Sequence, residues 1–146
     1  MTLAYKNNGF TLLELVIVIV IIAIIASIAY PTYSNFTRKG KLAEGTAKLS
    51  ELRVQLERYY QDNRTYHSAP NTCGIPDGNG TYFSYTCTTT SPITFTWTAS
   101  SLGNQGLGSA GTFVYSIDQD GAMATLKFNG SSSNSTCWEL DQGQCI

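Results

Sequence analysis

The sequence predicts an α+β fold in which a long, bent N-terminal helix packs on a four-stranded antiparallel sheet. Three observations support this expectation. Residues 10–29 form an apolar run, a helical pattern of apolar residues continues to about Gln61, and the second half of the chain alternates apolar and polar residues between turn-forming segments. With 146 residues, 42% of them hydrophobic, the chain has room for one membrane segment and one small head.

The apolar run is long enough to cross a bilayer. A helix over residues 10–30 rises about 1.5 Å per residue and spans about 30 Å, which equals the hydrocarbon thickness. A cleaved secretory signal is the alternative, with Lys6 in its basic region and residues 27–29 as its cleavage site. Two features oppose a secretory signal: the run exceeds the usual apolar core of roughly 7–15 residues, and Glu14 lies inside the run instead of before it.

Glu14 is the single charged residue of this run. A carboxylate in hydrocarbon costs several kcal/mol, so Glu14 requires a partner unless its side chain reaches the membrane surface. The simplest alternative is therefore an acid that snorkels to the interface from a plain membrane anchor. The sequence around Glu14 decides between the two interpretations.

Pro31 follows the apolar run and predicts a bend rather than an end of the helix. Gly40 and Gly45 weaken the next turns. Apolar residues then recur at helical spacing on one face: Leu42, Leu49, Leu52, Leu56 and Tyr59. We expect this stripe to cover the apolar face of the sheet.

Four segments of the second half are predicted to be strands. Residues 93–100 alternate strictly, with Ile93, Phe95, Trp97 and Ala99 on the apolar face, and form the clearest strand. Residues 113–117 and 124–128 flank a turn at Asp118-Gln119-Asp120-Gly121, and residues 82–87 form a weaker fourth strand. Residues 103–111 and 130–135 are rich in small polar residues and are predicted to be loops.

The four cysteines all lie downstream of the apolar run, at Cys73, Cys87, Cys137 and Cys145. An exported head with an even number of cysteines indicates disulfides, and the spacings do not match a zinc ribbon or a redox motif. Four cysteines allow three pairings. Joining sequence neighbours, Cys73 with Cys87 and Cys137 with Cys145, closes short loops and is favoured, but the sequence leaves the other pairings open.

Charge and residue types argue against several functions. Of the nine basic residues, seven lie between Arg38 and Arg64, and the rest of the head is mildly acidic, whereas nucleic-acid binding needs converging cations. His67 is the only histidine, and we expect it in a surface loop. Asp118 and Asp120 lack the ligand pattern of a calcium loop. We therefore predict no catalytic, metal or cofactor site. The tripeptides beginning at Asn35, Asn79, Asn129 and Asn134 fit a glycosylation sequon and equally fit turns.

The segment Gly9-Phe10-Thr11-Leu12-Leu13-Glu14-Leu15, behind a short leader with Lys6, resembles the class III signal of type IV pilins and related prepilin-processed proteins. The long helix, the four-stranded sheet and a cysteine pair around a C-terminal loop, here Cys137 and Cys145, are similar to the type IV pilin fold. Residues 56–63 and 135–138 most resemble minor pilins of the subfamily that includes the DNA-uptake receptor.

The resemblance implies four segments: a prepilin leader over residues 1–9, a transmembrane and assembly helix over 10–30, its amphipathic continuation over 31–62, and the pilin head over 63–146. It implies that a prepilin peptidase, which is also an N-methyltransferase, cuts after Gly9 and methylates Phe10. In a filament, Glu14 of one subunit would pair with the Phe10 ammonium of its neighbour, because apolar surroundings raise the cost of leaving either charge alone.

We therefore expect a non-enzymatic structural subunit of a type IV pilus, a minor one, whose partners are other pilin subunits and the prepilin peptidase. A single span would hold it in the inner membrane, with the head in the periplasm, until it joins an extracellular filament. A DNA-binding pilin for DNA uptake is an alternative that the scarce cations disfavour, although loops near Cys137 and Cys145 with Arg53, Arg58 and Arg64 would contribute. A type II secretion pseudopilin is a third possibility, which two cysteine pairs make less favoured.

Overall fold

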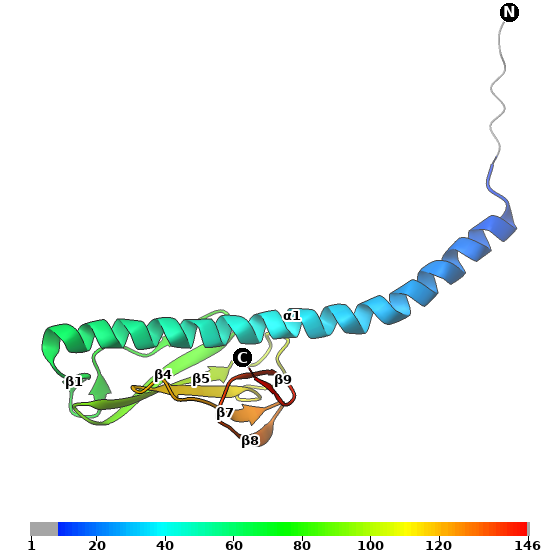
Figure 1. Cartoon of the computed structure of the whole chain (residues 1–146). Helices are drawn as coiled ribbons and strands as arrows, with labels where there is room; N and C mark the ends of the chain where they lie inside the picture. The colour runs from blue at the N-terminus through cyan, green and yellow to red at the C-terminus, as the bar shows by residue number, and fades with distance from the viewer. Residues whose placement is uncertain (1–8, 146) are drawn as a thin grey trace, which may run out of the picture. The chain divides into compact units, whose positions relative to one another are not determined.

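A computed structural model of the chain describes residues 9–145. The chain divides into two units, one ending at Thr37 and one beginning at Arg38, and each is described by itself. Helix α1 (Leu12–Asn63) runs continuously through Pro31 and contributes to both units (Figure 1). Apart from Gly9, the expected leader lies outside the described residues.

The second unit contains ten strands and the C-terminal part of α1. Six strands form one antiparallel sheet in the order β3-β4-β5-β6-β7-β8, and β1-β2 and β9-β10 are separate antiparallel pairs (Figure 1). The bounds are β1 (His67–Ala69), β2 (Thr72–Cys73), β3 (Gly78–Asn79), β4 (Phe83–Ser91), β5 (Thr94–Ser101), β6 (Val114–Asp118), β7 (Met123–Phe128), β8 (Ser131–Ser135), β9 (Glu139–Asp141) and β10 (Gln144–Cys145).

The main sheet has six strands, so the expectation of four is corrected. Strands β4 to β7 are the four predicted ones, while β3 and β8 are added at the two edges. Strand β8 lies in a segment predicted to be a loop. Asn129 and Gly130 take positive φ angles of 51° and 84° and form the turn that brings β8 back alongside β7. Strand β8 is then held by pairing with the backbone of β7, although its serine side chains carry no strand pattern.

The core lies between the second half of α1 and one face of the sheet. Leu42, Leu49, Leu52 and Leu56 are buried, as the helical stripe predicted, and Tyr59 is partly buried against them. On β5 the buried side chains are Phe95, Trp97, Ala99 and Ser101, and the residues between them face outward. Ile93 was predicted to share the apolar face, but it precedes β5 in a turn and is 62% exposed.

At Gly45, α1 approaches the sheet too closely to leave room for a side chain. A Cβ atom at Gly45 would lie 2.5 Å from the Cδ2 and Cε2 atoms of Phe83, a buried side chain of β4. A Cβ atom at Gly40, one turn earlier, would have no neighbour within 4 Å. The two helix glycines therefore differ: Gly45 is required for packing, and Gly40 is not.

Candidate assembly site

The start of α1 is fixed by a capping interaction. The backbone N–H of Glu14 donates to Thr11 Oγ1 at 3.2 Å, and α1 begins at Leu12. Thr11 and Glu14 thus stand three residues apart, as in a capping box, with the acidic residue in the first helical turn, where the positive end of the helix dipole favours it. This role of Thr11 was not predicted, although the Thr-x-x-Glu spacing before an apolar run is a signal for it.

The first turns of α1 carry large apolar side chains that the described chain leaves uncovered. From Leu12 to Ile28, the exposed fractions of these side chains run from 41% at Val16 to 82% at Leu12. By length and composition, this part of α1 is able to cross a membrane. A surface of this kind is stable only in lipid or against other apolar helices.

The residues expected to be processed lie directly before this helix. Gly9 and Phe10 are exposed and precede α1, and the exposed Glu14 follows one turn along. Within residues 9–145, Glu14 forms no ion pair. In the chain with its leader the nitrogen of Phe10 belongs to a peptide bond, so the amine expected to meet Glu14 arises only after a cut at Gly9.

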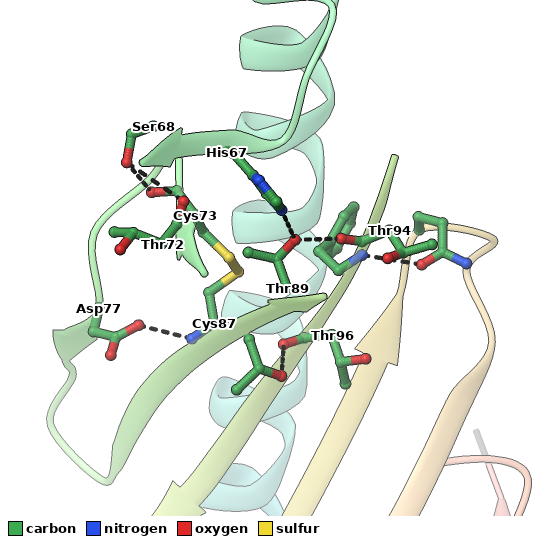
Figure 2. Close-up of a disulfide and its surroundings, with 12 residues drawn as sticks. His67, Ser68, Thr72, Cys73, Asp77, Cys87, Thr89, Thr94 and Thr96 are labelled. Carbon is green, nitrogen blue, oxygen red and sulfur yellow. Dashed lines mark hydrogen bonds between the residues drawn. A yellow bond between two sulfur atoms is a disulfide. The ribbon is translucent and has the colours of Figure 1, made fainter. Parts of the chain in front are cut away.

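Two disulfides hold the ends of the head. Cys73 joins Cys87 and so ties β2 to β4, and Cys137 joins Cys145 and closes the C-terminal loop. Figure 2 shows the first disulfide, beside which Asp77 accepts a hydrogen bond from the backbone N–H of Cys87 at 2.7 Å. This is the neighbour pairing among the three possible ones.

The expectation that His67 lies in a surface loop is wrong, because His67 is the first residue of β1. It is partly buried, and its Nε2 is 2.7 Å from Thr89 Oγ1 (Figure 2). The Thr89 hydroxyl in turn donates to the carbonyl of Thr94 at 2.6 Å. Because that bond uses the hydroxyl proton, Nε2 of His67 donates to Thr89 Oγ1. The His67 side chain therefore links β1 to β4 and has a structural role. Within residues 9–145, no group of His, Cys, Asp and Glu is placed to hold a metal ion.

The C-terminal loop is organised by the buried Glu139. Its carboxylate accepts hydrogen bonds from Ser135, from the N–H of Gly143 and from Ser133, which hold its pKa below the ordinary value although burial opposes this. Asp141 forms an ion pair with Lys39 of α1 at 2.7 Å, and the same contact lowers the pKa of Asp141. The loop is therefore fixed both internally and to α1.

Most of the basic side chains on α1 already have partners within the head. Lys39 pairs with Asp141, Lys41 donates to the carbonyl of Gln105 at 2.8 Å, and Lys48 pairs with Glu51. Arg53 is partly buried and donates to the carbonyl of Gln119 at 3.0 Å. Of the three arginines expected to contribute to DNA contact, Arg53 is therefore engaged.

The fold and the N-terminal segment together define a class of protein. A membrane-length apolar helix with an acid in its first turn continues into a helix that packs on an antiparallel sheet, and residues 5–30 match the prokaryotic N-terminal methylation motif. This combination is that of the type IV pilins, which confirms the resemblance seen in the sequence.

The particular family follows from the head. Residues 31–113 match the family described as type IV minor pilin ComP, DNA uptake sequence receptor, and the chain belongs to that family. It is thus a minor type IV pilin, a pilus subunit assembled after prepilin processing.

A solved structure supports the fold. The non-core minor pilin PilV of Neisseria meningitidis matches with a TM-score of 0.54 and 25% sequence identity, over 73% of this chain and 99% of the PilV chain. A comparison with curated proteins gave no match.

Proposed function

We propose that this pilin enters its filament through the first half of α1, after a cut that leaves Phe10 as a methylated N-terminus. A pair between Glu14 of one subunit and the Phe10 amine of its neighbour would fix the register. The observation that supports this role is the uncovered apolar surface from Leu12 to Ile28 with Glu14 as its one charge. A structural role without enzymatic activity accords with the fold and the family.

Energetics favour a charge pair at this position. Two unit charges about 4 Å apart attract by about 4 kcal/mol at an effective dielectric constant of about 20. An unpaired carboxylate among apolar helices costs several kcal/mol. Lipid covers the apolar side chains before assembly and neighbouring helices cover them afterwards, so burial alone discriminates poorly between registers. The pair at Glu14 supplies that discrimination.

The proposed location follows from the same features. The apolar part of α1 would hold the subunit in the inner membrane, and the head would face the periplasm. The two disulfides support this orientation, because they persist in an oxidising compartment. After assembly the head would lie on the outside of the filament.

The test compares Glu14→Val with Val18→Leu, which keeps the same helix apolar. Sheared pili and membranes are separated, and the subunit in each fraction is measured by immunoblot. We expect Glu14→Val to be processed but to be depleted from pili, whereas Val18→Leu enters them normally. Intact mass spectrometry confirms the start at methylated Phe10. A Glu14→Val subunit found in pili at the wild-type level would refute the pairing.

We propose DNA binding as a second candidate, because the head matches a family described as a DNA uptake sequence receptor. The exposed cations that have no partner in the described residues are Arg58, Arg64 and Lys127. So few phosphate contacts predict weak binding with a shallow dependence on salt. The family match favours a minor pilin over the pseudopilin alternative.

Filter binding of duplex DNA to the full-length protein in detergent, at rising salt, tests this candidate. Each phosphate contact contributes about 0.9 to the slope of log K against log salt. If both arginines contact DNA, Arg58→Gln with Arg64→Gln lowers the slope by about 1.8. The variant Lys48→Gln is the control, since it removes the same kind of charge from α1 at a residue that already pairs with Glu51. Absence of salt-dependent affinity in the wild type would remove this function.

A further inference from the structure

The outward face of the main sheet carries hydroxyl groups in register across neighbouring strands. Thr88 of β4 stands opposite Thr96 of β5, which stands opposite Asp118 of β6. Adjacent strands lie about 4.8 Å apart, so this row presents two hydroxyls and a carboxylate across about 10 Å, on the scale of one sugar ring with its substituents.

A polar groove of about 280 Å³ lies over this row. Its lining is mainly hydroxyl, amide and carboxylate groups, from Thr88, Thr90, Thr94, Thr96, Asp118 and Gln119, with Phe95 as the apolar member. Figure 2 shows Thr94 and Thr96 on β5, close to Thr89 of the neighbouring strand. The lining includes no basic residue, so the groove does not suit a phosphate or another anion.

The groove is rigid where it carries its carboxylate. Asp118 Oδ1 accepts hydrogen bonds from the N–H groups of Asp120 and Ala122, at 3.0 and 2.8 Å. Gln119 is held on both sides, since its Oε1 accepts from the N–H of Phe95 at 3.1 Å and its carbonyl accepts from Arg53 at 3.0 Å. A site held in this way loses little entropy when a ligand binds.

Two polar atoms of the row remain open. Within the described residues, neither Asp118 Oδ2 nor Thr96 Oγ1 has a hydrogen-bond partner, and Thr88 uses only its proton, which it donates to the carbonyl of Thr96 at 3.4 Å. The open groups are thus mainly acceptors, with one hydroxyl that both donates and accepts. They suit a ligand with several hydroxyl donors and no negative charge. A calcium ion is a poor fit, because it takes 6–8 oxygen ligands.

We propose that this groove binds one ring of a neutral sugar, with ring hydroxyls donating to Asp118 Oδ2 and to Thr88 Oγ1 and both donating to and accepting from the Thr96 hydroxyl. The site lies on the sheet face opposite α1 and is independent of filament entry and of DNA binding. The sugar ring has two possible sources, a glycan chain on another cell surface or a free monosaccharide. Both offer the same ring hydroxyls, but only in a glycan is the ring linked to further sugars.

Saturation-transfer NMR on the full-length protein tests the proposal, in a detergent without sugar groups. The probes are glucose, galactose, mannose and N-acetylglucosamine, each also as its β-linked trisaccharide. At least one probe is expected to give a saturable signal. A trisaccharide that binds at least threefold more tightly than its monosaccharide indicates a glycan chain, and equal binding indicates a free sugar.

Matched variants locate the site. Thr96→Val removes one hydroxyl bond and is expected to weaken binding about 2- to 10-fold, and Asp118→Asn about 10-fold or more. Thr98→Val is the control, because Thr98 shares the strand and the face of Thr96 but does not line the groove. Tryptophan fluorescence confirms that each variant is folded. Glucosamine and calcium ions are added as further probes. The proposal is overturned if no neutral sugar binds, including the case in which only glucosamine or calcium binds. It is also overturned if Thr98→Val weakens binding as much as Thr96→Val does.

Discussion

Alanine at Gly45 and alanine at Gly40 should have different effects on the head, although both replace a glycine in the same helix. Alanine is favoured over glycine inside a helix by about 0.8–1.0 kcal/mol, and this gain applies at both positions. At Gly40 a Cβ atom meets no neighbour within 4 Å. The variant Gly40→Ala should therefore be more stable than the wild type by close to that amount.

At Gly45 a steric cost opposes the same gain. The new Cβ atom would lie 2.5 Å from the ring of Phe83, which is buried and packs near Tyr115 with 6.1 Å between the ring centroids. Forcing an extra carbon into a packed core costs about 1–3 kcal/mol. The two variants should therefore differ by about 1–3 kcal/mol, or about 4–12 °C in Tm at roughly 4 °C per kcal/mol.

Thermal unfolding followed by tryptophan fluorescence is a suitable assay. Both tryptophans, Trp97 and Trp138, are buried in the head, so the signal reports the head even when the apolar helix is in detergent. Equal Tm values for Gly40→Ala and Gly45→Ala would refute the reasoning. Adding Phe83→Leu to Gly45→Ala should cost less than Phe83→Leu costs alone, because the shorter side chain relieves the contact.

Three further results are expected. Replacing Cys137 and Cys145 together by serine should lower the free energy of unfolding by about 2.5 kcal/mol, measured in urea, because the disulfide closes a short loop with a sequence separation of 8. The lowered pKa of Glu139 contributes stability above its unfolded pKa of about 4.3 that is lost as the pH falls through the folded value, so Glu139→Gln should flatten the acid limb of a plot of Tm against pH. Burial raises the pKa of Tyr66 and Tyr85 to about 12, so both should ionise late in an ultraviolet titration, and the stability that they contribute should be lost above about pH 10.

The sequence predicted those elements whose side chains carry a periodic signal. Strand β5 was visible because Phe95, Trp97 and Ala99 alternate with threonines, and the helix was visible because Leu42 and Leu49 lie on one face. Strand β8 was missed because serine has no apolar alternation, and its pairing depends on backbone groups of β7. The Asn129-Gly130 pair was the available signal, since it is typical of a two-residue hairpin turn.

The assembly segment was readable for a similar reason. Gly9, Phe10 and Glu14 lie within a few residues of one another, so a local pattern was enough to predict their roles, and residues 5–30 match the N-terminal methylation motif. The polar groove could not be predicted from the sequence, because the row of Thr88, Thr96 and Asp118 depends on the register of three strands. From the sequence, Asp118 was predicted to be part of a turn. Its position next to Thr96 on the outward face could be known only from the pairing of β5 with β6.

The disulfide between Cys73 and Cys87 has a consequence for a subunit under tension. A pull along α1 reaches the chain after Asn63, and only the residues between Asn63 and Cys73 can straighten before the covalent link passes the force to β4. These residues extend to about 30 Å at most. Because β4 lies between β3 and β5 in the sheet, the force then acts on an interior strand, and the head resists further lengthening until its strands slide apart.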